Sequence, residues 1–389
     1  MFYSRWAFSK ALRTAARTPD RDQAATLVYW PPPTDARAAA DVVGRICFYL
    51  RGSDVPVVVP GVSEVDPAAA PYLDATLVGP GPWQSQGAAG SPLHLLHDVR
   101  PRTLPAVARV LRSSLVVDPS LSYTSEFVPY RLLRAVFCAP FVQGPLRDEM
   151  LSGHRPGAKA FVMGTGPSAA LVDPDAVDAD VRILCNSAVR NKELISRLQP
   201  THVVFGDPIF HFGPSRYAAA FRADLREALA LAPFTVVVPE HSASLILEHV
   251  PELSGRLVGL ATAGDWNIPS REEPRVRDSG NILTQFLLPI AFALADSVDV
   301  AGCDGRQPTE NYFWKHNPGT QYDQQLMNDV FEAHPAFFRY RSYADYYDRH
   351  LTQLEQLIRI GEEQGKSVRG TTPSWMPPLA SRGAPVPEQ

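Results

Sequence analysis

Polar or glycine-rich segments follow four apolar runs in the second half of the chain, and their residue types suit nucleotide binding. Gly164-Thr165-Gly166-Pro167-Ser168 follows the first run; its glycines allow close backbone approach, and a helix start presents N–H groups to a phosphate. The segments after the other runs are Cys185-Asn186, Gly206-Asp207-Pro208 and Gly302-Cys303-Asp304. Ligands of open α/β sheets bind beyond the carboxyl ends of the strands, where these segments would meet.

Each of these segments also has a structural explanation. A Gly-x-Gly-Pro segment forms tight turns, and an isolated Asn or Asp after a strand commonly caps a helix. Their joint occurrence at four expected strand ends favours a ligand site over four unrelated turns.

The elements that position these segments alternate between strand and helix. Expected strands cover 159–163, 182–185, 202–205, 235–238 and 298–301, and expected helices cover 192–198, 217–231 and 282–295. Repeated βα units pair their strands in parallel through right-handed crossovers. We therefore predict a doubly wound, mostly parallel α/β sheet of Rossmann-like type in a nucleotide-binding catalytic domain over 158–365.

The order of the motifs resembles the bacterial sialyltransferases of glycosyltransferase family 42, and the related motility-accessory and pterin-diphosphokinase-like Rossmann proteins. In that family a strand and G-N-G-P-S come first, followed by Cys-Asn, a polar residue before Pro, Ser-Gly at the start of a long helix, and G-x-D. The matching segments here, over about residues 158–350, are Gly164 to Ser168 with Thr165 in place of Asn, Cys185-Asn186, Asp207-Pro208, Ser279-Gly280 and Gly302-Cys303-Asp304.

The resemblance implies inverting transfer of sialic acid or a similar sugar from a CMP-activated donor to a glycan or lipid acceptor. It implies no metal, and no cofactor besides the donor substrate. His316 matches the family's base, which takes the acceptor's proton, and a neutral imidazole suits that role. Tyr312 and Arg306, the latter in place of a second family tyrosine, would donate to the departing phosphate. The implied nucleotide-binding residues are Gly164, Thr165, Gly166, Pro167, Ser168, Asn186, Asp207, Ser279, Gly280 and Asp304.

Two other functions stay open. A diphosphokinase of the pterin type would need Mg²⁺ and carboxylates such as Asp207 and Asp304. A non-catalytic scaffold would bind nucleotide without turnover. Asp173-Pro174-Asp175 and Asp178-Ala179-Asp180 match the DxD of metal-dependent transferases, but a solvated acidic loop is the favoured explanation.

The rest of the chain carries no catalytic motif. Residues 1–145 predict a smaller α/β domain of unknown role, with strands at 26–30, 55–59 and 114–117 and helices at 35–51, 101–112 and 126–138. Segment 146–157 is the predicted linker, and 366–389, rich in Pro, Ser and Gly, is the predicted disordered tail. The basic segment 1–17 predicts a surface helix, either packed on this domain or in weak peripheral contact with anionic lipid on the inner face of the membrane.

The composition of the chain limits the classes of partner and the compartment that we expect for it. A formal net charge of -4 gives no basic surface for nucleic acid. The 4 cysteines are widely spaced, which indicates neither a disulfide framework nor a zinc site and favours the cytoplasm. The longest apolar stretch, 282–295, is shorter than the roughly 20 residues that span a bilayer. Homo-oligomer formation and a role in surface polysaccharide synthesis are compatible with these features.

Overall fold

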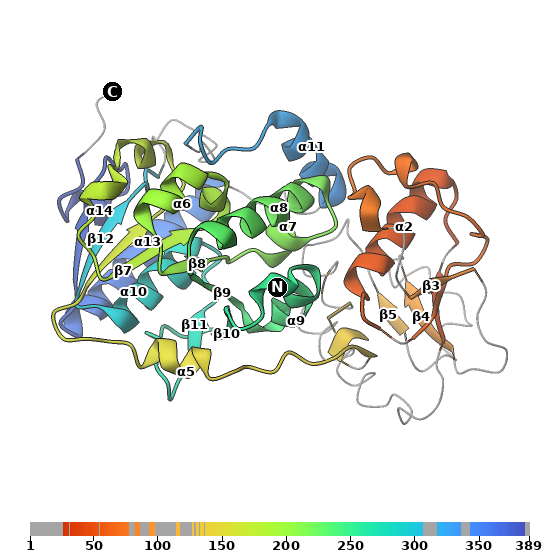
Figure 1. Ribbon diagram of the computed structural model, residues 1–389, viewed down its shortest axis with the longest axis horizontal. Coiled ribbons are helices and arrows are strands. Elements are labelled where there is room, and N and C mark those ends of the chain that lie inside the picture. Colours follow the sequence, from red (N-terminus) through yellow and green to blue (C-terminus); the bar gives the residue numbers. More distant parts are fainter. Residues whose placement is uncertain are drawn as a thin grey trace. The chain divides into compact units, whose positions relative to one another are not determined.

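The protein, described here from a computed structural model, divides into two compact units (Figure 1). Unit 1 comprises Met1–Phe141, Phe212–Ala219 and Asp323–Tyr340, and unit 2 comprises Val142–His211, Ala220–Tyr322 and Arg341–Gln389. The structure describes residues 26–30, 32–53, 55–77, 82–85, 93–97, 114–116, 127, 130, 131, 133–135, 137–305, 317–335 and 343–385.

Unit 1 is built on a five-stranded parallel sheet with the order β3-β2-β1-β4-β5. Its strands are β1 (Thr26–Trp30), β2 (Val57–Val58), β3 (Trp83–Gln84), β4 (Leu93–His97) and β5 (Ser114–Val116). Helix α2 (Ala36–Tyr49) follows β1 because Asp35 caps its first turn, accepting a hydrogen bond from the N–H of Ala38 at 2.8 Å. The expected helices at 1–17 and 101–112 lie outside the described residues, and the one at 126–138 is described only in part.

Two later segments of the chain belong to unit 1. Arg45 of α2 donates to the carbonyl of Ala333 at 2.6 Å, at the end of α11 (Gln324–Ala333). Arg216 pairs with the buried Asp329 of the same helix at 2.7 Å. Unit 1 therefore includes two segments from later in the chain, 212–219 and 323–340. The predicted first domain, which ended at residue 145, did not include them.

Unit 2 is built on an eight-stranded sheet with the order β11-β10-β9-β8-β7-β6-β12-β13, and every neighbouring pair is parallel. Its strands are β6 (Lys159–Met163), β7 (Val181–Cys185), β8 (His202–Val204), β9 (Thr235–Pro239), β10 (Leu257–Ala263), β11 (Arg275–Arg277), β12 (Ser297–Ala301) and β13 (Ser367–Gly370). The predicted doubly wound α/β fold is confirmed. The direction of the strand order reverses between β6 and β12, which makes this the topological switch point of the sheet.

Helices connect these strands. They are α5 (Leu146–Leu151), α6 (Lys192–Leu198), α7 (Pro208–Phe212), α8 (Arg216–Leu231), α9 (Ala243–His249), the π-helix η9 (Leu283–Leu287), α10 (Leu288–Leu294), α13 (Tyr343–Glu363) and α14 (Pro377–Ala380). Right-handed crossovers place α6 and α9 on one face and α10 and α13 on the other. None of the helices in the described part of the chain has the length and hydropathy needed to cross a membrane.

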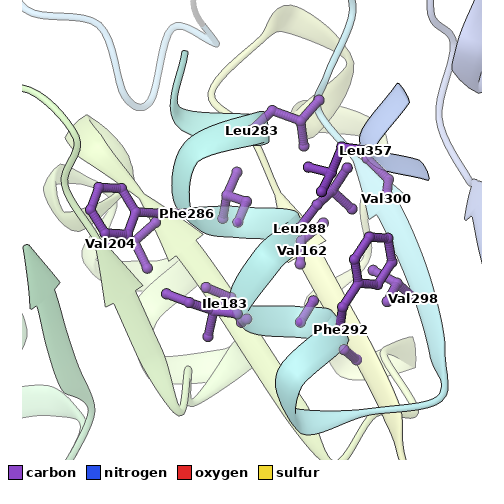
Figure 2. Close-up of a cluster of buried hydrophobic side chains, with 14 of the residues drawn as sticks. Val162, Ile183, Val204, Leu283, Phe286, Leu288, Phe292, Val298, Val300 and Leu357 are labelled. Atoms are coloured by element: carbon purple, nitrogen blue, oxygen red, sulfur yellow. The ribbon is translucent and has the colours of Figure 1, made fainter. Parts of the chain in front are cut away.

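The π-helix η9 and helix α10 form the centre of the core on one face of the sheet (Figure 2). Val162, Ile183 and Val204 point from β6, β7 and β8 toward Phe286 and its neighbours on these helical segments. The π-turn has a local cause: Pro289 lacks an N–H, and its ring would clash with the carbonyl four residues earlier. The N–H of Leu288 bonds instead to the carbonyl of Leu283, five residues back.

Two expectations about the ends of unit 2 are wrong. The predicted linker 146–157 contains helix α5, whose Met150 and Leu151 belong to the core. The predicted disordered tail contains β13 and α14, and β13 pairs with β12 from Ser297↔Ser367 to Val300↔Gly370. Tertiary pairing with a buried strand stabilises this polar segment, which has too little hydrophobicity to order itself.

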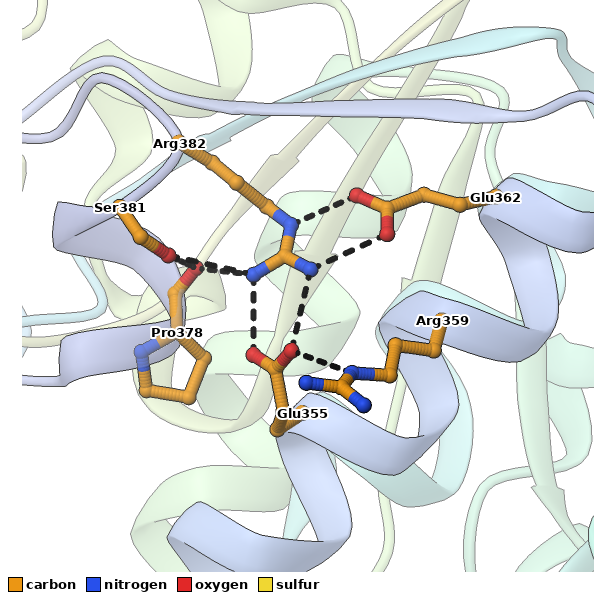
Figure 3. A network of polar contacts seen from close by, with 6 residues as sticks. All are labelled: Glu355, Arg359, Glu362, Pro378, Ser381 and Arg382. Atoms are coloured by element: carbon orange, nitrogen blue, oxygen red, sulfur yellow. Dashed lines mark hydrogen bonds and ion pairs between the residues drawn. The ribbon is translucent and has the colours of Figure 1, made fainter.

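An arginine near the C-terminal end of the described chain joins helix α14 to helix α13 (Figure 3). Arg382 donates to Glu362 through Nε at 2.7 Å, to Glu355 through Nη1 at 2.9 Å, and to the carbonyl of Pro378 at 2.9 Å. These bonds connect the end of α14 to the last turns of α13, and they lower the pKa of Glu355. Only 14% of the Arg382 side chain is exposed, so these bonds are partly shielded from water.

We expect Arg382→Ala to weaken the docking of β13 and α14. Removing a charged group with several hydrogen bonds costs about 1–3 kcal/mol. The measurement is hydrogen–deuterium exchange of the amides at 367–370, which should accelerate. Arg359→Ala is the matched control, because Arg359 contacts the same Glu355 at 2.8 Å but its side chain is 70% exposed. Equal exchange in the two variants would contradict this role of Arg382.

Candidate functional site at the carboxyl edge of the unit 2 sheet

The loops after β6 and β12 are in backbone contact at the switch point. The N–H of Gly164 bonds to the carbonyl of Ala301, and the N–H of Gly166 to that of Gly302, both at 2.9 Å. A Cβ on Gly164 would lie 2.5 Å from the carbonyl oxygen of Gly302, and Gly302 itself has φ 63°. These glycines are therefore required for the close approach of two loops.

Asp304 occupies the position that the sequence suggested for a phosphate. Its carboxylate accepts hydrogen bonds from the N–H and the hydroxyl of Ser168, both at 2.9 Å. A Cβ on Gly166 would collide with the same carboxylate. The expectation of free N–H groups in this turn is thus wrong for Gly164, Gly166 and Ser168. Burial raises the pKa of Asp304, against the opposing effect of the Ser168 hydrogen bonds.

Asn186 is the least satisfied of the predicted site residues. It follows β7 directly, with a left-handed backbone (φ 50°) that non-glycine residues rarely adopt. Its side-chain amide forms no hydrogen bond with any described residue, although its Oδ1 is buried. An unsatisfied buried acceptor costs about 1–3 kcal/mol, which a ligand that donates a hydrogen bond would recover. The combination of rare backbone geometry and an orphaned acceptor is typical of a functional position.

Asp207 lies at the start of a helix, which is the structural explanation that the sequence offered for an Asp after a strand. It is the third residue after β8, and its carbonyl accepts a hydrogen bond from the N–H of His211 at 3.2 Å. Asp207 therefore begins α7, and its place at the carboxyl edge agrees with the predicted position.

Ser279 and Gly280 lie between the edge strand β11 and the π-helix. The hydroxyl of Ser279 is buried and hydrogen-bonded to that of Thr284 at 2.8 Å. The carbonyl of Gly280 accepts a hydrogen bond from the hydroxyl of Tyr346 at 2.7 Å. The Ser-Gly motif is therefore held in place by α13, whose Tyr346 lies 66 positions after Gly280. The sequence carries no signal for Tyr346 at this edge.

The three predicted catalytic residues, Arg306, Tyr312 and His316, lie outside the described residues. The chain on either side of them is described. Gly305 follows Asp304 in the loop after β12, and the N–H of Asn317 bonds to the carbonyl of Thr165 at 2.9 Å. Both flanks of the segment therefore lie at the switch point.

Arg190 is a further basic group at this edge that sequence reasoning did not single out. It ends the 3₁₀ helix η6 (Asn186–Arg190), lies 4.8 Å from the ring centre of Tyr322, and has a buried Nη1 without a hydrogen bond. A positive charge in the same short helix as Asn186 suits an anionic ligand.

The acidic loop before β7 is paired with basic side chains. Arg197 contacts the carboxylates of Asp173 and Asp175 at 2.8 and 2.7 Å, and Lys159 contacts Asp178 at 2.9 Å. All of these groups are exposed. The interpretation of the DxD segments as a solvated acidic loop agrees with these contacts.

Comparison with known proteins gives similarity to solved structures alone. No family model matches the chain, and no curated protein matches it significantly. A structure of the sialyltransferase CstII from Campylobacter jejuni with the substrate analogue CMP-3FNeuAc is 10% identical and covers 59% of this chain and 86% of its own, with a TM-score of 0.32. A structure of a Cst-II variant with CMP is 11% identical over the same shares, also with a TM-score of 0.32. At this similarity, family and activity stay unassigned.

Proposed function

We propose that unit 2 is a glycosyltransferase that binds a CMP-activated sugar at the carboxyl edge of its sheet. The observation that carries the proposal is the orphaned, left-handed Asn186 next to the switch point. Its buried Oδ1 accepts a hydrogen bond, and the amino group of cytosine or a sugar hydroxyl supplies one. The motif order that resembles family 42 supports the choice of donor.

In this proposal basic side chains bind the donor phosphate. The backbone N–H groups of Gly164, Gly166 and Ser168 do not, because each already donates a hydrogen bond within the protein. Arg190 and Arg306 are the basic candidates. His316 takes the proton of an acceptor hydroxyl as the acceptor oxygen bonds to the anomeric carbon. The bond from that carbon to the phosphate oxygen breaks on the opposite side, and CMP leaves with both bonding electrons.

The proposal predicts turnover without a divalent metal. The acidic side chains of the DxD segments are engaged by Arg197 and Lys159, and the proposed mechanism stabilises the leaving phosphate with side chains. The test is a screen of CMP-, UDP- and GDP-sugars for hydrolysis and transfer, each with excess EDTA and with added Mg²⁺ or Mn²⁺. We expect a CMP-sugar to be consumed equally in all three conditions. Loss of activity on chelation, restored by metal, would contradict the proposed mechanism and favour a diphosphokinase or a metal-dependent transferase.

A further inference from the structure

The π-helix η9 carries a second amide at the carboxyl edge. Gln285 is only 5% exposed, yet its side-chain amide forms no hydrogen bond with any described residue. Its Oε1 lies 3.7 Å from the position of a Cβ on Gly206, the second residue after β8. Leu283 and Phe286 of the same π-helix belong to the apolar core.

The site of Gln285 adjoins that of Asn186. Strands β7 and β8 are neighbours, and Cys185 pairs with Val204, so Asn186 and Gly206 follow adjacent strand ends. The π-helix also packs against β7. Two side-chain amides that form no hydrogen bond with the described residues are thus presented from neighbouring positions, Asn186 after a strand and Gln285 from the π-helix.

The π-turn is what sets the direction of Gln285. A π-turn inserts one residue into a helix and rotates the residues before it relative to those after it, and such turns are frequent at functional sites. The segment is anchored at its start, where the N–H of Leu283 bonds to Oδ1 of Asn281 at 2.9 Å and the N–H of Gln285 to the carbonyl of Asn281 at 2.8 Å. These bonds therefore fix the backbone from which the Gln285 side chain extends.

We propose that Gln285 is a second ligand-binding amide, which contacts the same nucleotide as Asn186. The inference rests on the proposed function. An amide presents one donor pair and one acceptor, the complement of the polar edge of a nucleobase or of a pair of sugar hydroxyls. In the free protein this amide forms no hydrogen bond with any described residue, so it is available to a ligand.

The test compares Gln285→Met with the parent in the full chain, using thermal shift titrations with CMP, UMP, GMP and ATP. Methionine keeps the length of the side chain and removes both polar groups. We expect the dissociation constant for CMP to rise about tenfold, the effect of losing one buried hydrogen bond to a ligand. We expect the melting temperature without nucleotide to stay equal, because the amide forms no hydrogen bond with any described residue. Gln364→Met, at an exposed position after α13, is the control and should change neither value.

The outcomes separate the two proposals. A parent-like CMP affinity in Gln285→Met, or a lower melting temperature of its free form, overturns the role of Gln285 and leaves the proposed function standing. Absence of a shift in the parent with any of the four nucleotides overturns the proposed function, and the role of Gln285 with it. Weaker CMP binding with undiminished stability supports a ligand contact, since a purely structural glutamine would not produce that combination.

Discussion

His316→Ala is expected to lower the rate of sugar transfer by a factor of about 10² or more, because a positioned general base contributes about 10²–10⁴ to such a step. CMP binding should survive, since the proposed nucleotide contacts come from other residues. The next residue in the chain, Asn317, donates its N–H to the carbonyl of Thr165 in the turn after β6. The measurement is the initial rate of transfer beside a CMP thermal shift on the same preparations.

The matched control is His154→Ala. His154 lies at the amino end of the sheet, where its Nε2 is 2.8 Å from Asp296 just before β12. It is a partly exposed histidine of unit 2, and we expect its removal to leave the transfer rate unchanged. Equal transfer rates in His316→Ala and the parent would remove His316 from the mechanism.

CMP should raise the melting temperature more than UMP, GMP or ATP, and Asn186→Ala should abolish most of that rise. A ligand that binds only the folded state stabilises it by about 2.7 kcal/mol at a hundredfold excess over its dissociation constant. The loss of one hydrogen bond to a partly buried ligand is worth about 1–3 kcal/mol, a large share of this effect. Thermal shift against nucleotide concentration measures both quantities.

Two further variants separate ligand binding from folding. Asn186→Gly keeps the left-handed backbone without strain and removes the amide, so it should lose the CMP shift as Asn186→Ala does. Asn191→Ala removes the N-cap of α6, where Oδ1 accepts from the N–H of Leu194 at 3.0 Å, so it should lower the melting temperature and keep the shift. Better protection by ATP than by CMP, or an intact CMP shift in both Asn186 variants, would show that the site is not a CMP site.

Much of the local structure of unit 2 follows from short-range patterns. The expected strand 159–163 and helix 192–198 coincide with β6 and α6, because a buried parallel strand is a short continuous apolar run and α6 begins at its own cap, Asn191. The parallel sheet follows from the alternation of such elements. The same logic placed Asn186 and Asp304 after strands that proved to be parallel, at one edge of one sheet.

The sequence was less informative where stability comes from distant partners. The strand β13 consists of Ser-Val-Arg-Gly and is ordered by pairing with β12, which the local pattern does not encode. The segments 212–219 and 323–340 join unit 1 through contacts such as those of Asp74 with Pro214 and of Arg45 with Ala333. Such pairings depend on where the chain returns in space, and their residues are ordinary surface types when viewed singly.

For the candidate site too, some features follow from the sequence and others only from the tertiary structure. The sequence by itself determined which residue types follow each strand, since strand ends are local features. Only the tertiary structure decided what those residues contact: Asp304 lies 136 positions from Ser168 and occupies its N–H, so the turn has no free donor there for a phosphate. It also decided that the side-chain amides of Asn186 and Gln285 form no hydrogen bond with the described residues, because hydrogen bonding depends on every neighbour in space.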